Sequence, residues 1–345
     1  MYKILILLCP LLLYTSVDIL RKTPLIVGVN GHPFNQSDYQ NLPIDEQLSL
    51  IKELNLNSYR IDINPFSNGE VRDRLKFFEL VQKATKNGIK LLPMIYLTGF
   101  DFQLSNDECF RRGFNLGFGF GSKYGKYFEH YELGNELELQ KEISSTSKSG
   151  SDEKDYYLPN MKKLAAFLKG MNDGLKKTDP NSKTIINCAG WFHFVYLELL
   201  QKLGVNFDIA GYHWYSDMDD YAKSVNVDIL STLSIRLKKP IWFTEINYIS
   251  SSFNSSSFEE KRKDWTVKFI KQCETSDLIE AVFIYELIDE PNLQTAHESE
   301  KRFGLVKRKL LATKTTINNL SKNGNWILKE TANALKGKAN ILIPR

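Results

Sequence analysis

The segment HYELGNELEL, residues 130–139, joins a short strand-type run to a cluster of glutamates, and it is one of eight such runs in the chain. Longer amphipathic stretches lie between the runs, for example one with apolar residues at Ile44, Leu48, Ile51 and Leu54, a helical spacing. The strand-type runs span residues 25–30, 58–63, 90–96, 130–136, 183–191, 209–215, 240–247 and 279–289. The helical stretches span residues 44–55, 70–88, 160–180 and 258–275.

Most of these runs are apolar on both faces, which is typical of a buried parallel sheet. Eight strand–helix units in a chain of 345 residues predict an α/β fold, a single-domain (β/α)8 TIM barrel over residues 24–345. A doubly wound open sheet is the alternative, and the lack of a Gly-rich phosphate turn after the first run disfavours it. The polar segment 140–157 follows the fourth run and predicts a mobile loop at the active-site face.

The composition suits a protein with a large core, since 42% of the residues are hydrophobic and 12% are aromatic. A formal net charge of +4, with Lys and acidic residues mixed along the chain, predicts no nucleic-acid partner. Cys109, Cys188 and Cys273 show no CxxC spacing, and no His/Cys/Asp cluster has ligand spacing. The sequence therefore predicts no metal and no other cofactor, and it leaves the oligomeric state open.

The N-terminus differs from the rest of the chain. Lys3 precedes an apolar run at residues 4–13, which is too short for the roughly 20 residues of a membrane-spanning helix. Such a run is typical of a signal peptide. We therefore predict a signal peptide over residues 1–16 and a secreted or periplasmic protein without stable membrane insertion. A buried N-terminal strand or an uncleaved anchor is the alternative.

Two carboxylates follow apolar strand-type runs, Glu136 on the fourth run and Glu245 on the seventh. A barrel of this kind carries its site at the carboxyl ends of its strands, and its fourth and seventh strands face one another. Cleavage of a glycosidic bond needs two such carboxyl groups, one to protonate the leaving oxygen and one to attack the anomeric carbon or activate water. The further candidates near strand ends are His32, Arg60, Asn135, Trp191, His213, Tyr215 and Tyr285.

Two segments, YELGNE (131–136) and IWFTEINY (241–248), resemble the strand-4 and strand-7 motifs of clan A glycoside hydrolases. SYRIDI (58–63) and YHWY (212–215) are similar to the strand-2 and strand-6 segments of that clan, and the similarity covers nearly all of the chain after the leader. Families 39 and 5, or an unassigned relative, are the most similar. The resemblance implies a retaining β-glycoside hydrolase that cleaves an oligo- or polysaccharide through a covalent glycosyl-enzyme.

Carried over residue by residue, the resemblance implies that Glu136 is the general acid/base and Glu245 the nucleophile. Asn135 is similar to the Asn that bonds the sugar 2-hydroxyl, and His213 to the strand-6 histidine of the site. Arg60 and Tyr215 resemble the groups that hold the nucleophile.

The pattern departs from the clan at two positions. Leu137 follows the Asn–Glu pair where many relatives have Pro, and Tyr285 stands where many have a Trp floor under the reacting sugar. We expect His32 to bond a sugar hydroxyl and Trp191 to stack on a sugar ring.

Several alternatives stay open. Glu132 and Glu138 are expected to be solvated charges or members of supporting ion pairs. Arg60 has Asp62, on the same strand face, or another buried acid as a possible structural partner. A carbohydrate-binding pseudoenzyme or a transglycosylase fits the same barrel. A metal-dependent enzyme also fits, because the fold alone does not define the chemistry.

Overall fold

A computed structural model describes residues 24–96, 99–144, 149–253, 255, 257–295, 297–309 and 320–342. The signal peptide predicted for residues 1–16 lies outside this part of the chain. No helix within these ranges is long and apolar enough to cross a membrane.

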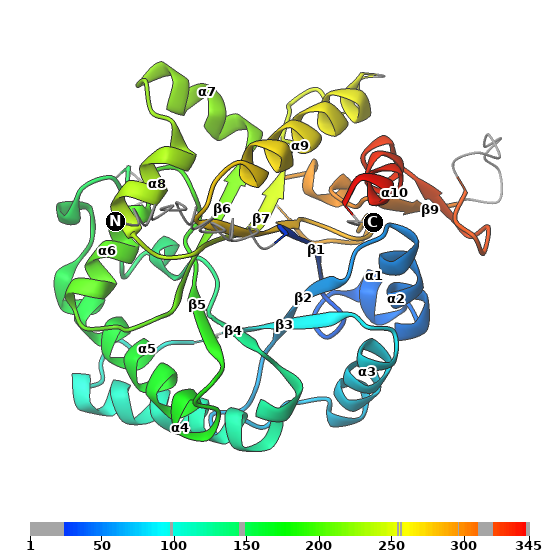
Figure 1. Cartoon of the computed structure of the whole chain (residues 1–345). Coiled ribbons are helices and arrows are strands. Elements are labelled where there is room, and N and C mark those ends of the chain that lie inside the picture. Colours follow the sequence, from blue (N-terminus) through cyan, green and yellow to red (C-terminus); the bar gives the residue numbers. More distant parts are fainter. Residues whose placement is uncertain are drawn as a thin grey trace, which may run out of the picture.

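Eight parallel strands close into a barrel, in which β8 pairs with β1 (Figure 1). The predicted (β/α)8 fold is therefore confirmed, and the open-sheet alternative is wrong. The strands are β1 (Ile26–Gly31), β2 (Ser58–Ile63), β3 (Lys90–Ile95), β4 (His130–Leu133), β5 (Lys183–Ile186), β6 (Ile209–Tyr215), β7 (Ile241–Asn247) and β8 (Ile279–Ile284).

Helices surround the barrel, and six of those in the described residues, α1, α4, α6, α7, α8 and α10, were not predicted from the sequence. The α-helices are α1 (Ser37–Gln40), α2 (Ile44–Glu53), α3 (Arg74–Lys86), α4 (Asn106–Tyr124), α5 (Leu158–Thr178), α6 (Phe194–Lys202), α7 (Ser216–Ser224), α8 (Ile229–Leu237), α9 (Phe258–Glu274) and α10 (Glu330–Leu342). The short 3-10 turns are η1 (Gly125–Tyr127), η2 (Leu137–Leu139), η3 (Glu153–Asp155) and η4 (Glu300–Arg302). Strands β9 (Val306–Arg308) and β10 (Trp326–Leu328) form an antiparallel pair beside α10, outside the barrel (Figure 1).

Three strands end earlier than the sequence predicts, and this matters for the site. The chain leaves β4 after Leu133, β5 after Ile186 and β8 after Ile284. The polar residues that follow these strands therefore lie in loops at the mouth of the barrel. Residues 140–144 and 149–157 follow β4 and η2, and Ser144 pairs with Tyr156 in an isolated bridge. The mobility predicted for this loop stays a prediction.

The barrel interior has an apolar layer beneath a polar one. Leu92 and Ile185 pair in register with Arg60 and Glu132, and paired residues on parallel strands point to the same face. Leu92 and Ile185 belong to a buried apolar cluster separate from the main core, completed by Ile209, Trp242, Ala281 and Phe283. Arg60 and Glu132 are also buried, so the polar layer has to satisfy its own charges.

Candidate active site

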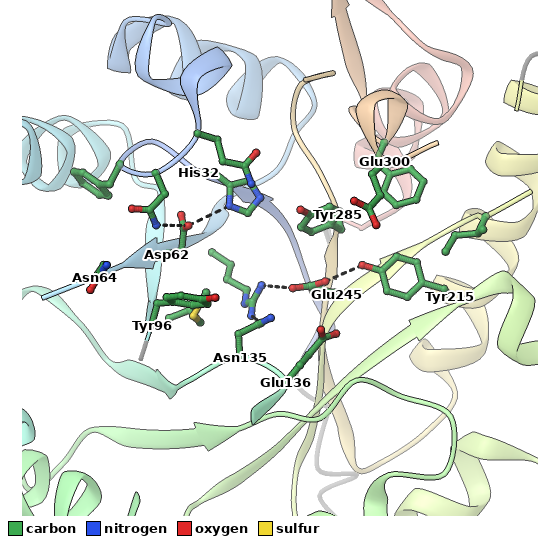
Figure 2. Close-up of a pocket in the computed structure, with 17 residues that line it drawn as sticks. His32, Asp62, Asn64, Tyr96, Asn135, Glu136, Tyr215, Glu245, Tyr285 and Glu300 are labelled. Carbon is green, nitrogen blue, oxygen red and sulfur yellow. Dashed lines mark hydrogen bonds and ion pairs between the residues drawn. The ribbon is translucent and has the colours of Figure 1, made fainter. Parts of the chain in front are cut away.

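A cavity of about 730 Å³ opens at the carboxyl ends of the barrel strands (Figure 2). Seven of the nine site residues predicted from the sequence line it, and they come from β2, β6, β7 and from the segments that follow β1, β4 and β8. These seven are His32, Arg60, Asn135, Glu136, Tyr215, Glu245 and Tyr285. The structure therefore brings together side chains that lie up to 253 positions apart in the sequence, from His32 to Tyr285.

Glu245 lies between two hydrogen-bond donors, as Figure 2 shows. Arg60 Nη1 donates to one carboxylate oxygen at 2.7 Å, and the Tyr215 hydroxyl donates to the other at 2.7 Å. Burial, followed by the nearby Glu245 charge, holds the pKa of Tyr215 well above its usual value, so its phenol keeps the proton that it donates. Both contacts suit an ionised carboxylate whose position is fixed.

Arg60 is the charged centre of this arrangement. Its Nη2 donates to Asn135 Oδ1 at 2.7 Å, and its Nε donates to the buried Glu132. Burial alone would lower the pKa of Arg60, but the carboxylates of Glu132 and Glu245 outweigh burial and raise it. Arg60 does not pair with Asp62, which instead contacts His32 at 3.3 Å and accepts from Asn35. Of the two structural partners suggested for Arg60, Asp62 is therefore wrong, whereas another buried acid, Glu132, is confirmed.

Glu136 occupies a turn directly after β4 and is more accessible than Glu245. Its side chain is 27% exposed, against 9% for the Glu245 side chain. His213 Nδ1 lies 2.6 Å from Glu136 Oε1 and 3.5 Å from Glu245 Oε2, so one imidazole contacts both carboxylates. Burial would lower the pKa of His213, but the charges of Glu245 and Glu136 raise it. His213 is fully buried and does not belong to the cavity lining, but it positions two groups that do.

The two carboxylates approach one another closely. An oxygen of Glu136, an oxygen of Glu245 and a nitrogen of His213 all lie within 4.8 Å of one another. Such a trio satisfies the minimal geometry for a metal site. The Arg60 guanidinium, however, already occupies one Glu245 oxygen, and a divalent cation would have to bind beside this buried positive charge.

Asn187 escaped the sequence analysis, and Glu132 and Glu138 are more deeply buried than one of the two expectations for them implies. Asn187 follows β5, and its side chain accepts from the Glu136 backbone N–H at 2.8 Å while donating to Glu132 Oε1 at 2.6 Å. Glu132 is fully buried in its ion pair with Arg60, so it is not a solvated charge. Glu138 is also fully buried, 3.1 Å from His193 Nδ1. Of the two expectations for these glutamates, the supporting ion pair is confirmed for Glu132, and solvent exposure is wrong for both.

Two further acidic side chains, Glu286 and Glu290, belong to the surroundings of His32. The buried Glu286 carboxylate lies 3.5 Å from His32 Nε2. Burial, followed by the charge of Glu290, holds the pKa of Glu286 well above its usual value. Burial also raises the pKa of Glu290 to about 8. Both side chains therefore favour the protonated form at neutral pH.

Trp191 lies outside the cavity lining. Its backbone carbonyl accepts from the Tyr212 hydroxyl at 2.7 Å, and its ring contacts Tyr221 with the centroids 5.6 Å apart. Its predicted role in stacking on a sugar stays a prediction.

The comparison with solved structures supports the fold. The structure is similar to that of a β-glucosidase from Thermotoga maritima in complex with a calystegine derivative, with a TM-score of 0.65 and 14% identity, covering 93% of this chain and 99% of that one. A structure described as a family 1 β-glucosidase from the same organism is similar with a TM-score of 0.64 and 13% identity, and it covers the same shares of both chains. The complex of the T. maritima β-glucosidase with cyclophellitol is similar with a TM-score of 0.64 and 13% identity, again over the same shares of both chains.

At this identity the similarity establishes the (β/α)8 barrel alone, and families 39 and 5 are not confirmed. The sequence matches no protein-family model and no curated protein.

Proposed function

We propose that the protein is a retaining β-glycoside hydrolase, with Glu245 as nucleophile and Glu136 as general acid/base. The observation that carries this proposal is the pair of carboxylates within 4.8 Å across one cavity, each in a different set of contacts. Retaining enzymes hold their two carboxyl groups about 5–5.5 Å apart, whereas inverting enzymes need about 6.5–9.5 Å to admit a water molecule. A separation within 4.8 Å between one oxygen of each carboxylate is compatible with the retaining arrangement.

In the first step, a Glu245 oxygen attacks the anomeric carbon of the bound sugar. The bond to the leaving-group oxygen breaks, and that oxygen takes the proton of the Glu136 carboxyl group. Arg60 and Tyr215 orient the attacking carboxylate, and His213 orients Glu136 through Oε1. The products of this step are a covalent glycosyl-enzyme ester on Glu245 and a free alcohol.

In the second step, the Glu136 carboxylate removes a proton from a water molecule, which attacks the anomeric carbon and releases Glu245. Two inversions restore the original β-configuration. If another sugar takes the place of water, the same residues catalyse transglycosylation, so the ratio of the two products depends on the acceptor.

The resemblance to clan A motifs supports this proposal, as does the fold shared with proteins described as β-glucosidases. The substrate class is a β-linked oligo- or polysaccharide. The proposal includes export through the predicted signal peptide.

The test is hydrolysis of β-aryl glycosides and β-linked polysaccharides by the intact protein and by Glu136→Ala and Glu245→Ala. We expect both variants to lose at least about 10²-fold in kcat on substrates with poor leaving groups. Sodium azide should then give a β-glycosyl azide with Glu136→Ala and an α-glycosyl azide with Glu245→Ala, because azide enters from the face of the missing carboxylate. Reversed stereochemistry would exchange the two roles.

Two rivals have distinct outcomes in the same assays. The exposed Glu298→Ala serves as a matched control and should keep full activity, since its partner Lys301 is a surface residue three positions away.

A folded protein that binds sugars and hydrolyses none would be a carbohydrate-binding pseudoenzyme. Activity that disappears with EDTA and returns with a divalent cation would favour a metal site at Glu136, His213 and Glu245 over covalent catalysis.

A further inference from the structure

We propose that a second pocket, next to the catalytic cavity, binds the carboxylate of an acidic sugar in the same substrate chain. This inference rests on the proposed glycosidase function and narrows its substrate to a polysaccharide that carries uronic acid units. The pocket has a volume of about 210 Å³, and Asn64 and Tyr96 line both it and the catalytic cavity. A sugar chain that leaves the catalytic cavity on this side therefore enters the second pocket.

The pocket has a firm apolar base. Phe100 packs edge-to-face against Phe167, with ring centroids 5.4 Å apart, and Leu116 of α4 completes this surface. Phe66 and Tyr96 are 45% and 41% exposed at the edge of the pocket. Exposed aromatic rings beside a sugar-binding cavity provide apolar faces against which sugar rings pack.

One wall of the pocket is a small hairpin that follows β2. Pro65 and Val71 pair as an antiparallel bridge, and the Phe66 N–H donates to the Glu70 carbonyl at 2.8 Å. The hairpin lies so close to α4 that a Cβ on Gly69 would meet the backbone nitrogen of Phe120 at 2.1 Å. This wall of the pocket therefore packs directly against α4.

Arg72 of this hairpin is oriented by two contacts, and among the described residues its two amino groups have no hydrogen-bond partner. Its Nε donates to the Asn64 carbonyl at 3.1 Å, and its guanidinium lies over the Phe66 ring, 4.5 Å from the centroid. Neither Arg72 nor Arg112, which also lines the pocket, forms an ion pair with any residue that the structure describes. A guanidinium oriented in this way, with amino groups that have no hydrogen-bond partner among the described residues, fits the two oxygens of a planar carboxylate.

The charged side chains that line the catalytic cavity and the second pocket indicate where an acidic sugar would bind. Arg72 and Arg112 face a single carboxylate in the second pocket, that of Asp101, which already accepts from the Gln103 backbone N–H. The catalytic cavity has the opposite balance, since four acidic side chains, Asp62, Glu136, Glu245 and Glu300, line it with two basic ones, Arg60 and His32. An anionic sugar is therefore repelled from the catalytic cavity and attracted to the second pocket, and the sugar that is cleaved is neutral.

The test is a direct binding measurement with a catalytically inactive Glu136→Gln/Glu245→Gln protein. Isothermal titration would compare three sets of β-linked oligosaccharides of equal length: neutral, uronic-acid-containing and sulfated. We expect the carboxylated set to bind about tenfold more tightly than the neutral set at low salt, and this advantage to shrink at high salt. Arg72→Gln and Arg112→Gln, added singly to the inactive protein, should each remove most of the advantage.

Arg111→Gln is the matched control, because Arg111 is an exposed neighbour of Arg112 on α4 that does not line the pocket. Equal affinity for neutral and carboxylated sets, or an equal loss from Arg111→Gln, would overturn the proposal, and so would tighter binding of the sulfated set. If no carboxylated oligosaccharide binds, the proposal also fails. Hydrolysis of small neutral aryl glycosides tests the catalytic proposal separately, because such substrates need only the catalytic cavity.

Discussion

At the scale of single residues, the side chain of Asn187 controls the geometry of the proposed acid/base. Glu136 has φ 45° and ψ 44°, a left-handed conformation that costs a non-glycine residue about 1–3 kcal/mol. Asn187 offsets this cost, because it accepts from the Glu136 N–H and donates to the Gly134 carbonyl at 3.0 Å. The same amide bonds Glu132, which pairs with Arg60, so it links the contacts of both catalytic carboxylates.

We therefore predict that Asn187→Ala impairs acid catalysis more than nucleophilic attack. A displaced Glu136 should lower kcat about 10–100-fold for substrates with poor leaving groups, because small misplacements of a catalytic group are costly. Activated aryl glycosides, whose leaving groups need no proton, should lose far less. The measurement is log kcat against leaving-group pKa. The control is Asn172→Ala, a buried amide that bonds Thr184 at the other end of β5. An equal loss on all substrates would show a merely structural role.

The hydroxyl of Tyr215 gives a second prediction at this scale. Tyr215→Phe removes one donor to Glu245 and leaves the Arg60 contact in place. We expect kcat to fall about tenfold with a small change in KM, because a charge-assisted hydrogen bond contributes about 1.5–3 kcal/mol. Steady-state kinetics would check this, with the exposed Tyr221→Phe as control. A large rise in KM with unchanged kcat would instead assign the hydroxyl to substrate binding.

At the scale of elements, the contact between α4 and α5 explains why the sequence analysis missed α4. This helix contains Gly113, Gly117, Gly119 and Gly121, and glycine disfavours helices. Close packing of α4 against α5 explains at least two of these glycines. A Cβ on Gly113 would meet the Phe167 carbonyl oxygen at 2.0 Å, and a Cβ on Gly117 would meet the Met171 carbonyl oxygen at 2.1 Å. Contacts of this kind are absent from any local pattern, whereas the strand pattern is local and predicted all eight barrel strands.

The same distinction applies to the candidate site. Motifs at strand ends identified Glu136, Glu245, Arg60 and Tyr215, and the register of the strands then brought these residues to one cavity. Asn187 gave no such signal, because its segment matches an ordinary buried strand and its partners lie 51 and 55 positions earlier in the chain.

The close helix contact yields the third prediction. Gly113→Ala should destabilise the fold by about 1–3 kcal/mol, because the new methyl group forces α4 and α5 apart. Gly337→Ala in α10 is the control, since no atom lies within 4 Å of a Cβ built there. It should be neutral or stabilising by up to about 1 kcal/mol through helix propensity. Urea denaturation would measure both. Equal stability of the two variants would contradict the close packing.

At the scale of the whole molecule, several buried carboxyl groups lie at the mouth of the barrel, and their titration should make the free energy of unfolding depend on pH. Glu290 has its pKa raised by burial from 4.5 to about 8, and that of Glu286 is raised too. Nearby Asp62 and Asp38 add to the Glu290 shift, while His32 opposes it. A carboxyl group with a raised pKa stabilises the fold fully below its unfolded pKa, and this contribution is lost as pH rises towards its folded pKa. The pKa of His32 and that of His213 are also raised, so their contribution disappears in the same direction.

The free energy of unfolding should therefore fall as pH rises from about 4.5 to 8. Glu290→Gln removes one titrating group and keeps its shape, so its stability should depend less on pH and exceed that of the intact protein at pH 8 by about 2–4 kcal/mol. Urea denaturation at several pH values would measure this, with the exposed Glu298→Gln as control. A stability that rises across this window, or an unchanged slope in Glu290→Gln, would contradict the assignment.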